Sequence, residues 1–168
     1  MSTSKAAPQA RREVCEYVQS NSGAPEKVFP LLCPVREAEW LPGWKYRLIY
    51  SQSGLAEPGC VFATPNEDGS ETTWIVTHYD PANFQIAFAW IRPEMLATRL
   101  EISLLRAGLD RTRMHIRYTY TALSPAGERE LQQMDAAWFA ERMQRWEKSI
   151  NHYLEQGTLI SGAEWEKL

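Results

Sequence analysis

Cysteine and histidine, the residues from which disulfide frameworks and zinc sites are built, are scarce in this sequence. Its 168 residues contain three of each. Cys15, Cys33 and Cys60 are odd in number, widely spaced and outside any Cys-x-x-Cys pattern, so the sequence indicates neither a disulfide framework nor a zinc site. We therefore expect reduced, buried thiols and no bound metal.

Signatures of several other functions are also absent. No Gly-x-Ser-x-Gly elbow, Gly-rich phosphate loop or His-Glu-x-x-His motif occurs, so we expect no cofactor. The net charge of −3 provides no basic surface for nucleic acid. No apolar run approaches the roughly 20 residues of a membrane span, and none follows the polar first ten residues. We expect a cytoplasmic protein without nucleic-acid binding or membrane insertion, as a monomer or a homodimer.

What the sequence does have is one long amphipathic segment near its end. The spacing predicts a single helix over 124–157, with Ser124 as N-cap, Pro125 at the first helical position and Gly157 at the C-terminal end. Its large apolar side chains recur every three or four residues and fall on one side. They are Leu131, Trp138, Phe139, Met143, Trp146, Ile150, Tyr153 and Leu154.

Before this segment the sequence alternates with a period of two, as strands do. Short helices are predicted after Pro25 and after Pro34, and both follow a first strand. The predicted strands are 12–20, 46–51, 59–64, 72–80, 84–91, 98–105 and 111–123. The fold class is therefore α+β: a curved antiparallel sheet of about seven strands wrapped around a long C-terminal helix, with two short helices after the first strand.

The order of these elements and several short sequence segments resemble the SRPBCC superfamily of START-like, or birch-pollen-allergen-like, helix-grip domains. These segments are Ala-Pro-Glu-Lys-Val-Phe at 24–29, Trp-Leu-Pro-Gly-Trp at 40–44, Glu-Pro-Gly-Cys-Val-Phe at 57–62, Thr-Trp-Ile-Val-Thr at 73–77 and residues 146–157. The run 33–40 is similar to a bacterial branch of unassigned function. The resemblance implies a ligand-binding domain over 11–157, between a disordered tail at 1–10 and a C-terminal tail at 158–168.

The superfamily implies a deep, mostly apolar cavity between sheet and helix for a lipid, sterol, polyketide or similar molecule. Side chains on the inward faces are expected to line it. Large aromatic rings favour an aromatic guest by stacking, and an arginine inside the apolar arc of the helix could anchor a carboxylate or a carbonyl group. The expected ligand-binding residues are Trp74, Phe88, Trp90, Tyr118, Trp138 and Arg142.

Two side chains are candidates for acid–base chemistry. His78 shares a strand face with Trp74, so it is expected to point into the cavity unless a bulge turns it outward. Glu37 lies in the region that forms the cavity entrance in this superfamily; it could equally be an exposed helix carboxylate. Asp135 also falls in the apolar arc, where an ion pair with Arg142 would explain both.

Three functions remain open because members of this superfamily have different chemistries. The first is binding of a small hydrophobic or aromatic molecule without catalysis. The second is a cyclase- or dehydratase-type enzyme acting in the same cavity. The third is an interaction domain like the chaperone-activating relatives, which predicts an exposed apolar patch on the outer face of the sheet.

Overall fold

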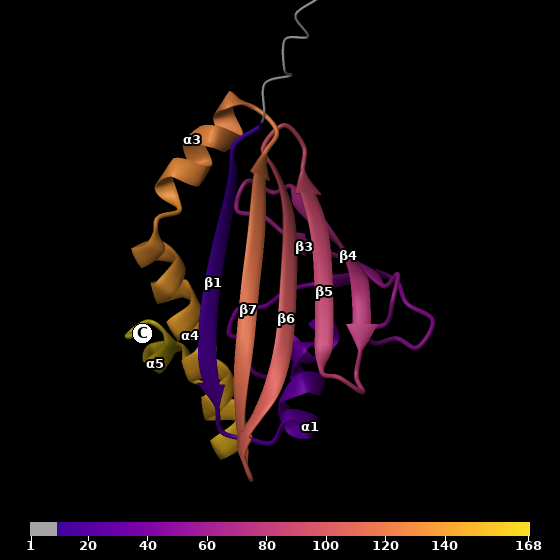
Figure 1. Cartoon of the computed structure of the whole chain (residues 1–168), viewed down its shortest axis with the longest axis vertical. Helices are drawn as coiled ribbons and strands as arrows, with labels where there is room; N and C mark the ends of the chain where they lie inside the picture. The colour runs from indigo at the N-terminus through magenta and orange to yellow at the C-terminus, as the bar shows by residue number, and fades with distance from the viewer. Residues whose placement is uncertain (1–9) are drawn as a thin grey trace, which may run out of the picture.

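A computed structural model describes residues 10–168, so the tail expected at 1–10 lies outside the described residues except for Ala10. The seven strands form one antiparallel sheet in the order β1-β7-β6-β5-β4-β3-β2 (Figure 1). The sheet of about seven strands that the sequence predicts is confirmed. The strands are β1 (Arg12–Asn21), β2 (Arg47–Tyr50), β3 (Val61–Pro65), β4 (Glu71–Asp80), β5 (Gln85–Arg92), β6 (Leu96–Gly108) and β7 (Arg111–Ala122).

Short helical segments follow β1, and each begins near a proline, whose missing N–H costs nothing in a first helical turn. They are α1 (Pro25–Val28), the 3₁₀ segment η1 (Phe29–Leu32) and α2 (Pro34–Glu37). At the other end of the chain lie α3 (Pro125–Gln133), α4 (Ala136–Gln156) and α5 (Gly162–Trp165). Figure 1 shows α3 and α4 following the β1 edge of the sheet, with α5 beside α4.

The prediction of one uninterrupted helix over 124–157 is wrong, because the helix breaks at Met134. Met134 has φ −84° and ψ 62°, and the next residue, Asp135, caps α4 by accepting a hydrogen bond from the Trp138 N–H at 2.8 Å. Asp135 is therefore a cap and not a partner for Arg142. The two outer ends are as predicted: Ser124 caps α3, and Gly157 closes α4 with φ 70°.

The sheet places alternate side chains on a buried inner face and a solvated outer face. β7 follows the predicted alternation, with Met114, Ile116 and Tyr118 buried and Arg113 and Arg117 exposed. The core lies between this inner face, the short helices and α4. Burial of this apolar surface is the main force that holds the layers together.

Hydrogen bonds fix α4 against the rest of the molecule at both sides. The Tyr17 hydroxyl of β1 donates to Glu147 at 2.7 Å, and the Asn151 amide donates to the Ser20 carbonyl at 2.9 Å. On the other side the Ser149 hydroxyl donates to the carbonyl of Trp40, which is fully buried. These bonds set the helix at a fixed distance from the sheet and so define the space between them.

A β-bulge changes the parity of β4. The pairing of β4 with β5 shifts register between Val76 and His78, so Thr77 and His78 are both exposed and Tyr79 turns inward against Phe29. Because side chains alternate strictly along a regular strand, one extra residue moves every later side chain to the opposite face. The expectation that His78 points into the cavity is therefore wrong.

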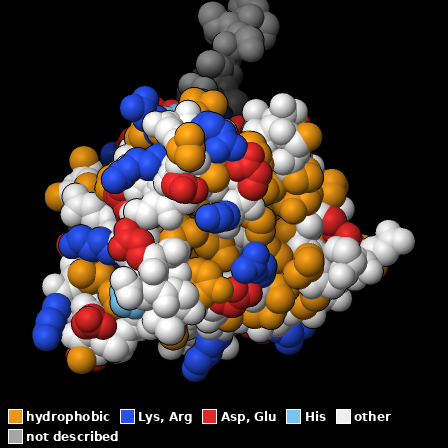
Figure 2. All heavy atoms as spheres, turned by 90° about the horizontal axis from the view of Figure 1, so that it is seen from below, with side chains coloured by type: hydrophobic (Ala, Val, Ile, Leu, Met, Phe, Trp, Pro, Cys, Tyr) orange, Lys and Arg blue, Asp and Glu red, His pale blue; other side chains and the backbone are white. Residues whose placement is uncertain are grey.

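Hydrophobic side chains also reach the surface of the described chain. Figure 2 shows them gathered in the middle and on one side of the face seen from below, among charged side chains. No helix within residues 10–168 is long and apolar enough to cross a membrane. Within the same range, no three His, Cys, Asp or Glu side chains lie close enough together to hold a metal ion.

Candidate ligand-binding cavity

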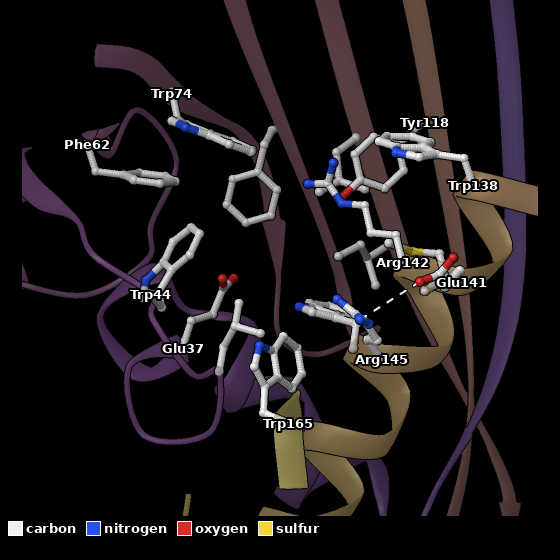
Figure 3. Close-up of a pocket in the computed structure, with 16 residues that line it drawn as sticks. Glu37, Trp44, Phe62, Trp74, Tyr118, Trp138, Glu141, Arg142, Arg145 and Trp165 are labelled. Atoms are coloured by element: carbon white, nitrogen blue, oxygen red, sulfur yellow. Dashed lines mark ion pairs between the residues drawn. The ribbon is translucent and has the colours of Figure 1, made fainter. Parts of the chain in front are cut away.

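A cavity of about 390 Å³ lies between the inner face of the sheet, the segment after α2, and helices α4 and α5. Figure 3 shows the side chains that point into it. Most of them are aromatic or aliphatic, and the polar ones come mainly from α4. The lining residues are Glu37, Leu41, Trp44, Phe62, Trp74, Phe88, Leu100, Ile102, Tyr118, Trp138, Glu141, Arg142, Met143, Arg145, Trp146 and Trp165.

Three rings from neighbouring strands form the wall on the β3 side. Phe62 and Trp74 are opposite each other in the β3–β4 register and stack with ring centroids 5.5 Å apart. Phe88 lies nearly perpendicular to both rings. The Trp74 indole N–H donates to the Thr64 hydroxyl at 2.9 Å, which fixes the plane of the ring. The wall is therefore rigid and offers flat aromatic surface to a guest.

The opposite wall comes from β7 and α4. The Tyr118 ring packs edge-on against Phe139 with centroids 5.7 Å apart. Trp138, on the first turn of α4, lies beside Tyr118 (Figure 3). The Trp44 side chain forms a third side, held by a 2.8 Å hydrogen bond from its indole N–H to the Pro34 carbonyl.

Glu37, the last residue of α2, points its carboxyl group into the cavity (Figure 3). The side chain is half-buried because the cavity gives it contact with solvent, yet aromatic rings line the same cavity and the Glu37 carboxyl group has no hydrogen-bond or ion-pair partner within residues 10–168. Removal from water disfavours the charged form, so burial raises the pKa of Glu37 from its ordinary value of 4.5 to about 8. At neutral pH this carboxyl group is mostly protonated and can donate a hydrogen bond.

Two arginines one helical turn apart supply positive charge. The Arg142 guanidinium lies over the Trp138 ring, 5.5 Å from its centroid. The Arg145 guanidinium lies 5.9 Å from the Trp165 ring centroid and 3.8 Å from Glu141 at its nearest atom, while its Nε is buried without a hydrogen-bond partner among the described residues. Stacking on indoles holds both groups while leaving N–H donors free.

The structure brings together six of the eight residues singled out from the sequence. Trp74, Phe88, Tyr118, Trp138, Arg142 and Glu37 all line this cavity. Trp90 does not: its ring lies behind Trp74 with centroids 3.9 Å apart and lines a neighbouring cavity instead. His78 lies outside both, on the exposed face of the sheet.

Of the sixteen lining residues, ten were not singled out from the sequence, and four of these illustrate different reasons. Arg145 follows Arg142 by three positions and shares its helix face, so helical spacing could have identified it. Phe62 belongs to a predicted strand whose faces were not assigned. Glu141 is a charged residue outside the apolar side of the predicted helix, and Trp165 lies in the C-terminal tail, where no periodicity indicates a direction.

Comparison with known proteins finds no matching family model and no matching curated protein. Solved structures do match. Norcoclaurine synthase from Thalictrum flavum, in complex with dopamine and hydroxybenzaldehyde, is 12% identical with a TM-score of 0.66 over 88% of this chain and 89% of that one. The chain has the helix-grip fold.

Two further structures support this assignment of the helix-grip fold. An aromatase/cyclase from Streptomyces sp. R1128 is 14% identical, with a TM-score of 0.63 over 87% of this chain and 95% of that one. Ara h 8.0201 is 13% identical, with a TM-score of 0.61 over 87% and 99%. The fold that the SRPBCC resemblance implied is confirmed. Identities this low establish the fold and leave the chemistry to the residues of the cavity.

Proposed function

We propose that this helix-grip protein binds a small aromatic or hydrophobic molecule in the 390 Å³ cavity. The observation that carries the proposal is the wall of stacked and edge-on rings around a space of ligand size. The structural neighbours support it at the level of ligand class, since norcoclaurine synthase forms a complex with dopamine and hydroxybenzaldehyde. Arg142 and Arg145 are the donors available to a carbonyl or anionic group on the guest.

A fluorescence titration with N-phenyl-1-naphthylamine, a neutral aromatic probe, tests this function. We expect saturable binding by the wild-type protein and about 3- to 10-fold weaker binding by Trp138→Ala, since an aromatic contact contributes roughly 0.5–1.5 kcal/mol beyond its buried area. Trp138 is half-buried on a helix, so its loss does not open the core. Tyr50→Ala is the matched control, because Tyr50 is an exposed aromatic residue outside the cavity.

The proposal fails if the wild-type protein does not saturate with the probe. It also fails if Trp138→Ala and Tyr50→Ala have the same affinity as the wild type. In either case the cavity is not where an aromatic molecule binds.

The environment of Glu37 favours a second candidate function, in which the same cavity catalyses proton transfer to a bound aromatic carbonyl compound. A carboxyl group with a pKa near 8 that faces a cavity and has no protein partner is suited to act as a general acid at neutral pH. This candidate requires Glu37 to hold its proton near neutral pH. The pH dependence of stability in Glu37→Gln measures whether it does.

The interaction-domain alternative has less support. The outer face of the sheet does expose Val14, Val18 and Ile75. However, ion pairs such as Arg99–Glu101 at 2.9 Å lie among these side chains and interrupt the apolar surface. A cavity lined by aromatic rings fits the binding of a small molecule better than that of a partner protein.

A further inference from the structure

A second cavity of about 320 Å³ adjoins the first. Four side chains line both cavities: Trp44, Trp74, Tyr118 and Arg142. A molecule bound against these four can therefore extend from one space into the other. The second space reaches up to Met134, at the break between α3 and α4.

The second cavity contains hydroxyl groups without protein partners: the Tyr118 hydroxyl is shared with the first cavity, whereas those of Thr98 and Tyr120 are not. Thr98 is opposite Trp90 on β5 and Tyr120 on β7, so these three side chains form one row on the inner face. Thr98 is only 5% exposed, and its hydroxyl oxygen has no hydrogen-bond partner within residues 10–168. Tyr118 and Tyr120 also line this cavity, and neither hydroxyl forms a hydrogen bond with another residue within 10–168. A buried hydroxyl without a partner is costly, and a ligand atom would satisfy it.

The charge of this cavity has one sign. Lys45, Arg92 and Arg142 line it, and no Asp or Glu does. Arg92 forms an ion pair with Glu130, whereas neither Lys45 nor Arg142 has a carboxylate within 4.0 Å among the described residues. Burial raises the pKa of Tyr118 and of Tyr120, so both hydroxyls stay protonated and can donate.

We propose that the second cavity is a binding site for an oxyanion, such as a carboxylate or a sulfonate, on a ligand whose aromatic part lies in the first cavity. The inference rests on the proposed function and adds the chemical class of the ligand: an aromatic acid. Lys45 and Arg142 supply positive charge, and Thr98 and Tyr120 supply hydroxyl donors to the oxygens. Glu37 lines only the first cavity, so its carboxyl group lies near the aromatic part of the ligand and not beside the oxyanion.

Two probes that differ by one group test this site. 8-Anilinonaphthalene-1-sulfonate is N-phenyl-1-naphthylamine with a sulfonate added, and the sulfonate stands in for the oxyanion. We expect Lys45→Gln to weaken binding of the sulfonate probe about 2- to 5-fold and to leave the neutral probe unchanged, because Lys45 lines only the second cavity. Adding Thr98→Val to Lys45→Gln is expected to weaken the sulfonate probe further.

Lys148→Gln is the matched control, since Lys148 is an exposed lysine of α4 that lines neither cavity and its replacement removes the same charge. The inference is overturned if the neutral probe binds but Lys45→Gln weakens the affinity for the sulfonate probe no more than Lys148→Gln does. If neither probe binds the wild-type protein, the proposed function itself has failed. The two failures are therefore distinguishable.

Discussion

Glu37 shows what residue type and position can and cannot predict. The SRPBCC resemblance suggested that Glu37 lies at the cavity entrance, and the structure puts its carboxyl group in the cavity. The same position was equally compatible with an exposed helix carboxylate. The difference depends on aromatic rings that line the same cavity as Glu37, such as Trp44 and Trp165. Trp165 comes from the far end of the chain, and a single sequence does not show which of these rings meet.

The pKa of Glu37 makes a prediction about stability. In the unfolded chain this group loses its proton near pH 4.5, whereas in the folded protein it keeps the proton until about pH 8. Between these values the folded state binds more protons, so the free energy of unfolding falls as pH rises, by up to about 1.4 kcal/mol per pH unit from this group. The contribution is fully present below pH 4.5 and is lost above pH 8.

We expect Glu37→Gln to remove this fall, because the amide is neutral at every pH. The measurement is urea unfolding at pH 5, 6, 7 and 8 for both proteins, and the stability difference between them should grow in favour of the variant as pH rises. Glu67→Gln, in the exposed turn after β3, controls for loss of a carboxylate. Parallel stability curves for Glu37→Gln and the wild type would show that Glu37 ionises normally and would remove the acid–base candidate function.

At the scale of the element, periodicity predicted the types of helix and strand well and their irregularities poorly. The alternation in β7 was correct over its whole length, and both caps at the ends of the helical region were correct. The sequence did not predict the positions of the bulge before His78 and the helix break at Met134. Asp135 was interpreted as a polar residue in the apolar arc of a helix, although Asp is also a good N-cap, and the local sequence supports both interpretations.

The start of α3 is held by a close approach that only glycine permits. A Cβ at Gly127 would lie 2.0 Å from the Met95 carbonyl oxygen, which belongs to the backbone of the β5–β6 turn and cannot rotate away. We expect Gly127→Ala to lower the free energy of unfolding by about 1–3 kcal/mol, as overpacking of a buried site does. Helix propensity acts in the other direction, because alanine is favoured over glycine within a helix by about 1 kcal/mol.

Chemical denaturation of Gly127→Ala measures the balance of these two effects. Gly162→Ala is the matched control, because Gly162 also lies in the first turn of a helix and an added Cβ there meets nothing within 4 Å. Equal stability of Gly127→Ala and the wild type would mean that α3 can shift away from the β5–β6 turn at no cost.

For the molecule as a whole, the layers could be predicted and the closure of the cavity could not. A sheet with one apolar face and a helix with one apolar side have few ways to bury both, and this is why the helix-grip fold follows from the pattern. The cavity is closed by side chains from segments without periodicity. Trp44 precedes β2, and Trp165 is in the tail expected at 158–168, where α5 places it against Arg145. Such contacts depend on the assembled fold.

Trp165 lines the cavity from the end of the chain farthest in sequence from Glu37, and the two lie close together in Figure 3. It is half-buried, and its main polar contact is the Arg145 guanidinium over its ring at 5.9 Å. Because exposed contacts of this kind contribute only about 0.5–1 kcal/mol, we expect Trp165→Ala to change global stability by about 1 kcal/mol or less.

The effect of Trp165→Ala on ligand exchange is expected to be larger than its effect on stability. Removing the indole takes away one wall of the cavity, so bound N-phenyl-1-naphthylamine should dissociate several times faster with little change in its association rate, as is usual for changes at one interface. Stopped-flow dilution of the complex measures this rate, and Trp165→Phe, which keeps a ring, should restore most of the slow dissociation. If Trp165→Ala releases the probe at the wild-type rate, α5 packs beside the cavity without closing it.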